Sequence, residues 1–264
     1  MLYGSFSMKK LLYIFTILAG LTSCADSYNI QGTSSVSLLD GSKLYLKTVK
    51  NGQLESIDSC EVVHGKFKFA GLLDTVMMVN LFMDDRSLMM PIVLEKGNIV
   101  VRIDDSSRKV SGTPLNELLY AFIDQHNQLD NRMNELGHRE SQMLLDGIDE
   151  REIAEQLSVE AQQIEMEEDT LITNFIVKNS DNVLGPGVFM MITAGMEYPM
   201  LTPQIEHIMT LASDAFKNDS YVKEFYKAAN EIQAKMQGMD DTPATQKQGE
   251  PSDSVIQNIL NGKE

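Results

Sequence analysis

The apolar residues of this chain recur with one period before Gly112 and with another after Thr113. Between Tyr28 and Gly112 apolar and polar residues alternate, which is typical of strands with one buried face. After Thr113 apolar residues recur every three or four positions, which is typical of amphipathic helices. The sequence therefore predicts an α+β chain, with an N-terminal antiparallel β-sandwich or open barrel at 28–112 and a C-terminal α-helical domain at 113–236.

The N-terminal part contains seven or eight short apolar segments that are separated by turn residues. The clearest turn is Asn51-Gly52, the strongest short signal for a β-hairpin, and His64-Gly65 is a second one. Strands this short and this numerous favour a sandwich or an open barrel. The predicted strands are 43–50, 53–58, 60–63, 66–69, 75–83, 88–94, 98–104 and 109–110.

The first predicted helix is amphipathic and about six turns long. Thr113 followed by Pro114 is typical of an N-cap and a first helical residue. Over 115–136 apolar residues follow at intervals of four and three, and Gly137 is predicted to end the helix. His126 lies on this apolar seam, where a hydrogen-bonded core histidine is favoured over a ligand or a general base. Further helices are predicted at 149–179, 182–196, 203–215 and 220–236.

Residues 1–23 have the features of a bacterial signal peptide. Lys9-Lys10 forms a basic start, and the apolar stretch 11–18 is too short to span a bilayer. The segment Leu21-Thr22-Ser23-Cys24 then resembles a lipobox, which is a branched apolar residue, two small residues and a cysteine. Met8 directly precedes Lys9 and is an alternative start of translation.

Prokaryotic lipoproteins with this pattern are cut before the cysteine, whose sulfur takes a diacylglycerol and whose amine is acylated. Several acyl chains hold a protein on a membrane far longer than one chain does. The sequence therefore predicts lipidation of Cys24, a short tether at 24–27, and a cell-envelope location with membrane lipid as a partner. Ala25 after the cysteine favours the outer membrane. The alternatives are an ordinary secretory peptide and an uncleaved anchor helix.

The net charge of the chain limits the classes of partner that it is expected to bind. Lys plus Arg number 22 against 38 Asp plus Glu, so the net charge is −16, which argues against nucleic acid. Removal of residues 1–23 deletes two lysines and leaves −18. A protein this acidic is expected to stand away from anionic headgroups. Residues 138–169 carry eleven acids and two arginines, a net −9 that indicates a solvated face more than a metal or cationic partner.

The polar tail at 237–264 is predicted to be disordered.

Candidate reactive residues are few. Cys60 is the one thiol besides Cys24, and it is interpreted as a small core residue because the sequence shows no cation or helix start beside it. His64 is interpreted as an exposed turn residue, and the pairs Asp84-Asp85 and Asp104-Asp105 as solvated loop ends. His138 and His207 have no metal-ligand spacing, and no known catalytic motif is present. The sequence thus predicts no catalytic, cofactor-binding or metal-binding residue, and no enzyme.

Four further segments carry a resemblance to a known family. They are HGKFKFAG at 64–71, VLEKGNIVVRID at 93–104, SGTPLNELLYAF at 111–122 and DNVLGPGVF at 181–189. Together with the Cys24 lipobox they resemble the domain-of-unknown-function 4369 lipoprotein family of Bacteroides-type bacteria. In that family a small β domain and a helical segment usually precede a thioredoxin-like domain. This chain has no C-x-x-C pair, so the redox activity of the family is not carried over to any residue.

Three hypotheses of function follow. The first is a non-catalytic, membrane-anchored binding or interaction module that engages an envelope protein or ligand through its β domain. The second is an accessory role in envelope thiol–disulfide exchange, in which Cys60 or a helical groove engages a thioredoxin-like partner. The third and least favoured is an enzyme that uses the aspartate pairs or the acidic helix.

Overall fold

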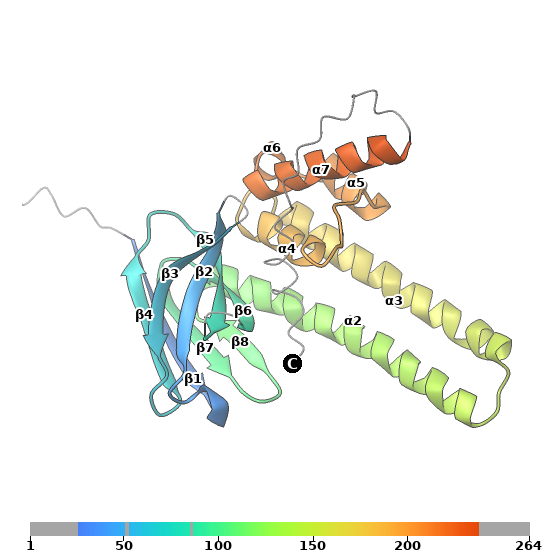
Figure 1. The fold of residues 1–264 in the computed structure, drawn as a ribbon, viewed down its shortest axis with the longest axis horizontal. Coiled ribbons are helices and arrows are strands. Elements are labelled where there is room, and N and C mark those ends of the chain that lie inside the picture. Colours follow the sequence, from blue (N-terminus) through green and yellow to red (C-terminus); the bar gives the residue numbers. More distant parts are fainter. Residues whose placement is uncertain (1–25, 51–52, 85–86, 238–264) are drawn as a thin grey trace, which may run out of the picture.

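The computed structural model describes residues 26–50, 53–84 and 87–237 (Figure 1). The signal peptide, Cys24, most of the predicted tail and the Asn51-Gly52 turn lie outside the described residues. Eight strands form two four-stranded sheets, with the orders β4-β1-β7-β8 and β3-β2-β5-β6. The predicted architecture, an open β-sandwich followed by helices, is confirmed. The strands are β1 Ser27–Ser34, β2 Lys43–Lys50, β3 Gln53–Glu61, β4 Lys66–Leu72, β5 Met77–Met83, β6 Ser87–Leu94, β7 Gly97–Ile103 and β8 Arg108–Ser111.

The first sheet is not fully antiparallel, which corrects the sequence prediction. β1 lies between β4, to which it is antiparallel, and β7, to which it is parallel, with Ile30 opposite Ile99. Alternation of apolar residues reports the buried face of a strand but not its direction, so the parallel pair could not be read from the sequence. A second difference is that β3 is one continuous strand where two were predicted, and a register shift at Leu46/Lys47 of β2 accommodates it.

The chain joins the first sheet earlier than the predicted tether allows. The backbone oxygen of Asp26 accepts a hydrogen bond from Leu73 N at 2.8 Å, and its carboxylate lies 2.7 Å from Lys96 Nζ. Ser27 already pairs with Leu72 in β1. The last two residues of the predicted tether, 26 and 27, are therefore part of the β domain, because they complete the edge where β4 ends.

The helices follow the predicted order with two corrections. The first helix runs through Gly137 and ends eight residues later, because Gly137 faces open space and Met143, in the turns beyond it, packs half-buried against other apolar side chains. The helix predicted at 203–215 is divided into Pro203–Leu211 and Asp214–Lys217, because Ala212 is extended and the Ser213 side chain caps the second helix by accepting a hydrogen bond from Phe216 N. No helix within the described residues is long and apolar enough to cross a bilayer. The helices are α2 Pro114–Leu145, α3 Glu150–Lys178, α4 Leu184–Thr193, α5 Pro203–Leu211, α6 Asp214–Lys217 and α7 Ser220–Met236, with the 3-10 turn η1 at Ser37–Leu39.

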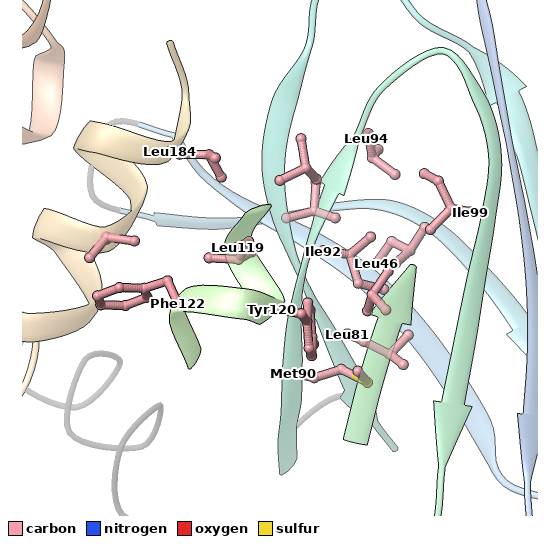
Figure 2. Packing of buried hydrophobic residues seen from close by; sticks show 14 of the residues in the cluster. Leu46, Leu81, Met90, Ile92, Leu94, Ile99, Leu119, Tyr120, Phe122 and Leu184 are labelled. Atoms are coloured by element: carbon pink, nitrogen blue, oxygen red, sulfur yellow. The ribbon is translucent and has the colours of Figure 1, made fainter. Parts of the chain in front are cut away.

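One buried core extends from the sheets into the helices. Leu119 and Tyr120 of α2 face Met90 and Ile92 of β6 (Figure 2), and the same cluster continues to Phe225 of α7. The Tyr120 hydroxyl donates a hydrogen bond to the carbonyl of Pro91 at 3.0 Å. The core therefore does not divide at residue 112, although the hydrophobic period changes there.

The start of α2 is held by side chains that are distant in sequence. Thr113 makes no side-chain cap; instead the carboxylate of Glu95 accepts hydrogen bonds from the N–H groups of Leu115 and Asn116, at 2.8 and 3.1 Å. The buried amide of Asn116 bonds both the N–H and the carbonyl of Val93, at 2.9 and 2.7 Å. This joint of Glu95 and Asn116 fixes the direction in which α2 leaves the sandwich.

The distal halves of α2 and α3 leave the rest of the molecule as a long two-helix hairpin (Figure 1). We call residues 129–164 the helical arm. It has a small core of its own, and α2 alone spans about 48 Å at 1.5 Å per residue. The arm core consists of Leu129, Leu136, Ile153, Leu157 and Ile164.

Candidate functional site

The most concentrated group of chemically active side chains lies where the helical arm meets the body. His126 of α2 contacts Asp130 through Nδ1 at 3.3 Å and Glu168 of α3 through Nε2 at 2.9 Å. The His126 side chain is 28% exposed, so the seam position predicted for it is confirmed. Its ring also lies against Phe122, with 6.0 Å between the ring centroids.

These three side chains are the one group in the described part of the chain that could supply several metal ligands. One ligand atom from each of His126, Asp130 and Glu168 lies within 4.8 Å of the others. An imidazole with two carboxylates suits zinc or iron. Both ring nitrogens, however, already face a carboxylate on opposite edges of the ring, so a metal would have to displace one of these contacts. In the observed arrangement the three residues tie α2 to α3.

A depression of about 460 Å³ adjoins this cluster. His126 and Glu168 form its polar side, whereas Phe122, Ile172 and Ile192 form its apolar side. A larger groove of about 830 Å³ lies on another side of the same helix pair, and its lining includes Leu118, Met166, Leu171, Asn174 and Lys178. A third depression of about 470 Å³ lies between the second sheet and the helices and is lined in part by Thr48, Met78, Asn182, Pro186 and Tyr221.

Cys60 packs half-buried against the main core, on β3 opposite Leu44. Burial raises the pKa of its thiol to about 11, and the negative charge of Asp58 adds to this effect, against a backbone hydrogen bond from Lys68 that lowers the pKa. The thiolate is the nucleophile in exchange reactions, so this environment disfavours reactivity at neutral pH. The geometry agrees with the interpretation of Cys60 as a core residue.

The polar residues predicted to lie in turns are found there. His64 is exposed and adopts a positive φ of 51° in the turn between β3 and β4. Asp84 has a φ of 47°, and its carboxylate accepts a hydrogen bond from Lys43 N at 3.2 Å. Asp104 accepts a hydrogen bond from the Ser35 hydroxyl at 2.8 Å. Asp85 lies outside the described residues.

The acidic run at 138–169 is exposed over most of its length and partly paired. Arg139 of α2 contacts Glu160 of α3 at 2.7 Å, and Arg132 contacts Glu167. His138 is exposed on the same hairpin. These ion pairs link α2 to α3, which agrees with a solvated, structural role for the acidic run at 138–169.

The sequence interpretation missed the two acidic partners of His126. Asp130 follows it by four residues on one helix, and this spacing brings side chains together. Glu168 lies on the other helix of the pair, and the apolar pattern of each helix alone does not give the register that brings it beside His126. His207 lies elsewhere, exposed on α5 and facing a small depression that Asp169 and Asn174 also line.

Residues 28–119 match the model of one protein family, DUF4369, which is described as a domain of unknown function. The match confirms the family resemblance for the β domain and the start of α2. It includes the segments 64–71 and 93–104, whereas 181–189 lies beyond it. A search of the curated proteins finds no match to the chain.

Proposed function

Starting from a DUF4369 domain at residues 28–119, we propose that the protein is a lipid-anchored interaction module of the cell envelope. Acylated Cys24 anchors the protein in the outer membrane. The protein binds an envelope protein there and catalyses no reaction. The description of the family gives no activity, so the proposal depends on the lipobox and on the shape of the molecule.

The observation that carries the proposal is the helical arm. The arm extends away from the sandwich and exposes apolar side chains that no other described part of the chain covers: Leu145 at the tip is 82% exposed, Leu144 beside it is exposed, and so is Val159 farther along α3. Holding a long hairpin away from the main core gives up burial, so we interpret the arm as a surface for recognition. This favours the arm over the β domain as the binding surface.

Site-specific crosslinking in cells tests this proposal. A photoreactive amino acid at Leu145 should give a defined adduct with one envelope protein, identified by mass spectrometry. The matched control places the same amino acid at Ser56, an exposed residue of β3, where no such adduct should form. The adduct should weaken when Leu144 is replaced with Ser. Equal crosslinking from Leu145 and Ser56, or none from Leu145, would remove the support for binding through the arm.

The alternative role, in thiol–disulfide exchange, has less support from the geometry. A thiol that exchanges readily needs a thiolate near neutral pH and an open approach. Cys60 is half-buried, and its pKa is raised to about 11. A partner could still use a helical groove, and the crosslinking experiment would identify a thioredoxin-like protein if one binds.

A further inference from the structure

The point at which the chain enters the fold determines how the molecule sits on its anchor. Asp26 is already bound to Leu73 and Lys96, and Ser27 is already in β1. Only Ala25 separates these residues from Cys24. We propose that the β domain rests directly on the lipid surface, with the end where β1 begins facing the headgroups and the helical arm pointing away. This inference rests on the proposed lipidation of Cys24.

The covalent reach leaves little freedom. Two virtual bonds of about 3.8 Å connect the Cα atoms of Cys24 and Asp26, so these atoms lie within about 8 Å of each other. The headgroup region on each side of a bilayer is about 5–8 Å thick. A sulfur whose acyl chains enter the hydrocarbon therefore places Asp26 at the level of the headgroups or just above them.

The side chains around this entry point suit a lipid surface. Leu72, directly opposite Ser27, is 75% exposed, and Val76 in the link to β5 is exposed as well. Lys96, on the turn before β7, is exposed at the same end of the sheet, where its ammonium group pairs with Asp26. An apolar side chain that inserts next to a cation is the usual composition of a membrane-contacting surface.

The distribution of charge favours the same orientation. Residues 26–112 carry ten Lys and Arg and eleven Asp and Glu, a net charge of −1, whereas residues 138–169 carry −9. Anionic headgroups repel the second segment far more strongly than the first. The β1 start and the tip of the arm lie at opposite ends of the long axis (Figure 1), so the most acidic segment is also the one farthest from the anchor. The charge of the whole chain predicts that the entire protein stands away from the membrane. We instead expect only the helical arm to do so.

Cysteine labelling on vesicles tests the orientation. The lipidated full-length protein is purified from membranes, in a Cys60→Ala background, and reconstituted in vesicles of phosphatidylethanolamine and phosphatidylglycerol. Mass spectrometry of the N-terminal peptide first establishes that Cys24 is acylated. A membrane-impermeant maleimide should then modify Leu72→Cys about tenfold more slowly in vesicles than in detergent. A tenfold change corresponds to the lower end of the free energy that the burial of one leucine side chain contributes. Labelling of Leu145→Cys at the arm tip should not change.

A spacer provides the second arm of the experiment. About twelve Gly and Ser residues inserted between Ala25 and Asp26 reach about 20 Å and should restore the labelling of Leu72→Cys. An acylated protein whose Leu72→Cys reacts equally fast in vesicles and detergent would overturn the proposed orientation. An unacylated Cys24 would instead overturn the proposed function, so the two failures are distinguishable.

Discussion

Glu95 accepts a hydrogen bond from the backbone N–H of Asn116 at 3.1 Å, and this contact joins the end of the second sheet to the first turn of α2. Both side chains are buried. They belong to two of the segments that carry the family resemblance, 93–104 and 111–122. The family match continues past the sandwich to residue 119, which agrees with the start of α2 being a structural part of the β domain.

Replacing Glu95 with Ala should destabilise the protein by about 2 kcal/mol, because the buried N–H of Asn116 and the half-buried N–H of Leu115 at the helix start lose their acceptor. Glu95→Gln keeps one acceptor oxygen and should lower the free energy of unfolding by less than Glu95→Ala does. Urea denaturation followed by circular dichroism measures both. Glu61→Ala, on the exposed end of β3, is the control and should change stability by no more than about 0.5 kcal/mol. If Glu95→Ala lowers the free energy of unfolding by no more than Glu61→Ala does, then the contacts of Glu95 at the start of α2 do not stabilise the protein.

Gly137→Ala should stabilise the protein by about 0.5–1 kcal/mol. The residue is exposed inside α2, and an added Cβ would meet nothing within 4 Å. Gly185→Ala in α4 is the opposite case, because its Cβ would lie 2.6 Å from the backbone oxygen of Asn179. It should lower the midpoint of thermal unfolding. If Gly137→Ala destabilises the protein, then α2 does not continue through this position.

Cys60 should react slowly with a maleimide in the folded protein. The pKa of the thiol is raised from 9.0 to about 11, chiefly by burial, so less thiolate is present at any pH below 11. At pH 8 labelling should be about ten- to a hundredfold slower than in guanidinium, because the higher nucleophilicity of a more basic thiolate offsets part of the loss. The measurement uses a form without residues 1–24, and equal rates with and without denaturant would favour the redox alternative.

The contact between His126 and Glu168 should be stabilising and independent of metal. A double-mutant cycle with His126→Ala and Glu168→Ala should give a coupling energy of about 0.5–1 kcal/mol, discounted because both groups are partly exposed. The exposed pair Lys227 and Glu231, 3.8 Å apart on α7, serves as the comparison and should couple more weakly. A melting temperature that rises with added zinc in the wild type, but not in His126→Ala, would instead identify a metal site.

Local patterns predicted local structure well. The apolar seam over 115–136 is buried or half-buried throughout, and the turns at His64 and Asp84 lie where turn residues indicated. Gly137 misled because an exposed glycine costs a helix only about 1 kcal/mol, less than the burial that the turns beyond it gain.

Contacts distant in sequence could not be predicted in the same way. β1 is too polar to have been identified as a separate strand, yet it is an inner strand of its sheet and pairs in parallel with β7. The cap that Glu95 provides depends on where the turn at Lys96-Gly97 places it. Glu168 depends on the hairpin register of α2 and α3. Each of these needs the chain folded before the partners are neighbours.

The proposed function depends most on the acylation of Cys24, and metabolic labelling tests this acylation directly. Cells that produce the protein are grown with radioactive palmitate and then separated into membrane and soluble fractions. We expect a labelled protein in the membrane fraction and an unlabelled, mislocalised Cys24→Ala variant. A wild-type protein that stays unlabelled and is found in the soluble fraction would contradict the proposed acylation.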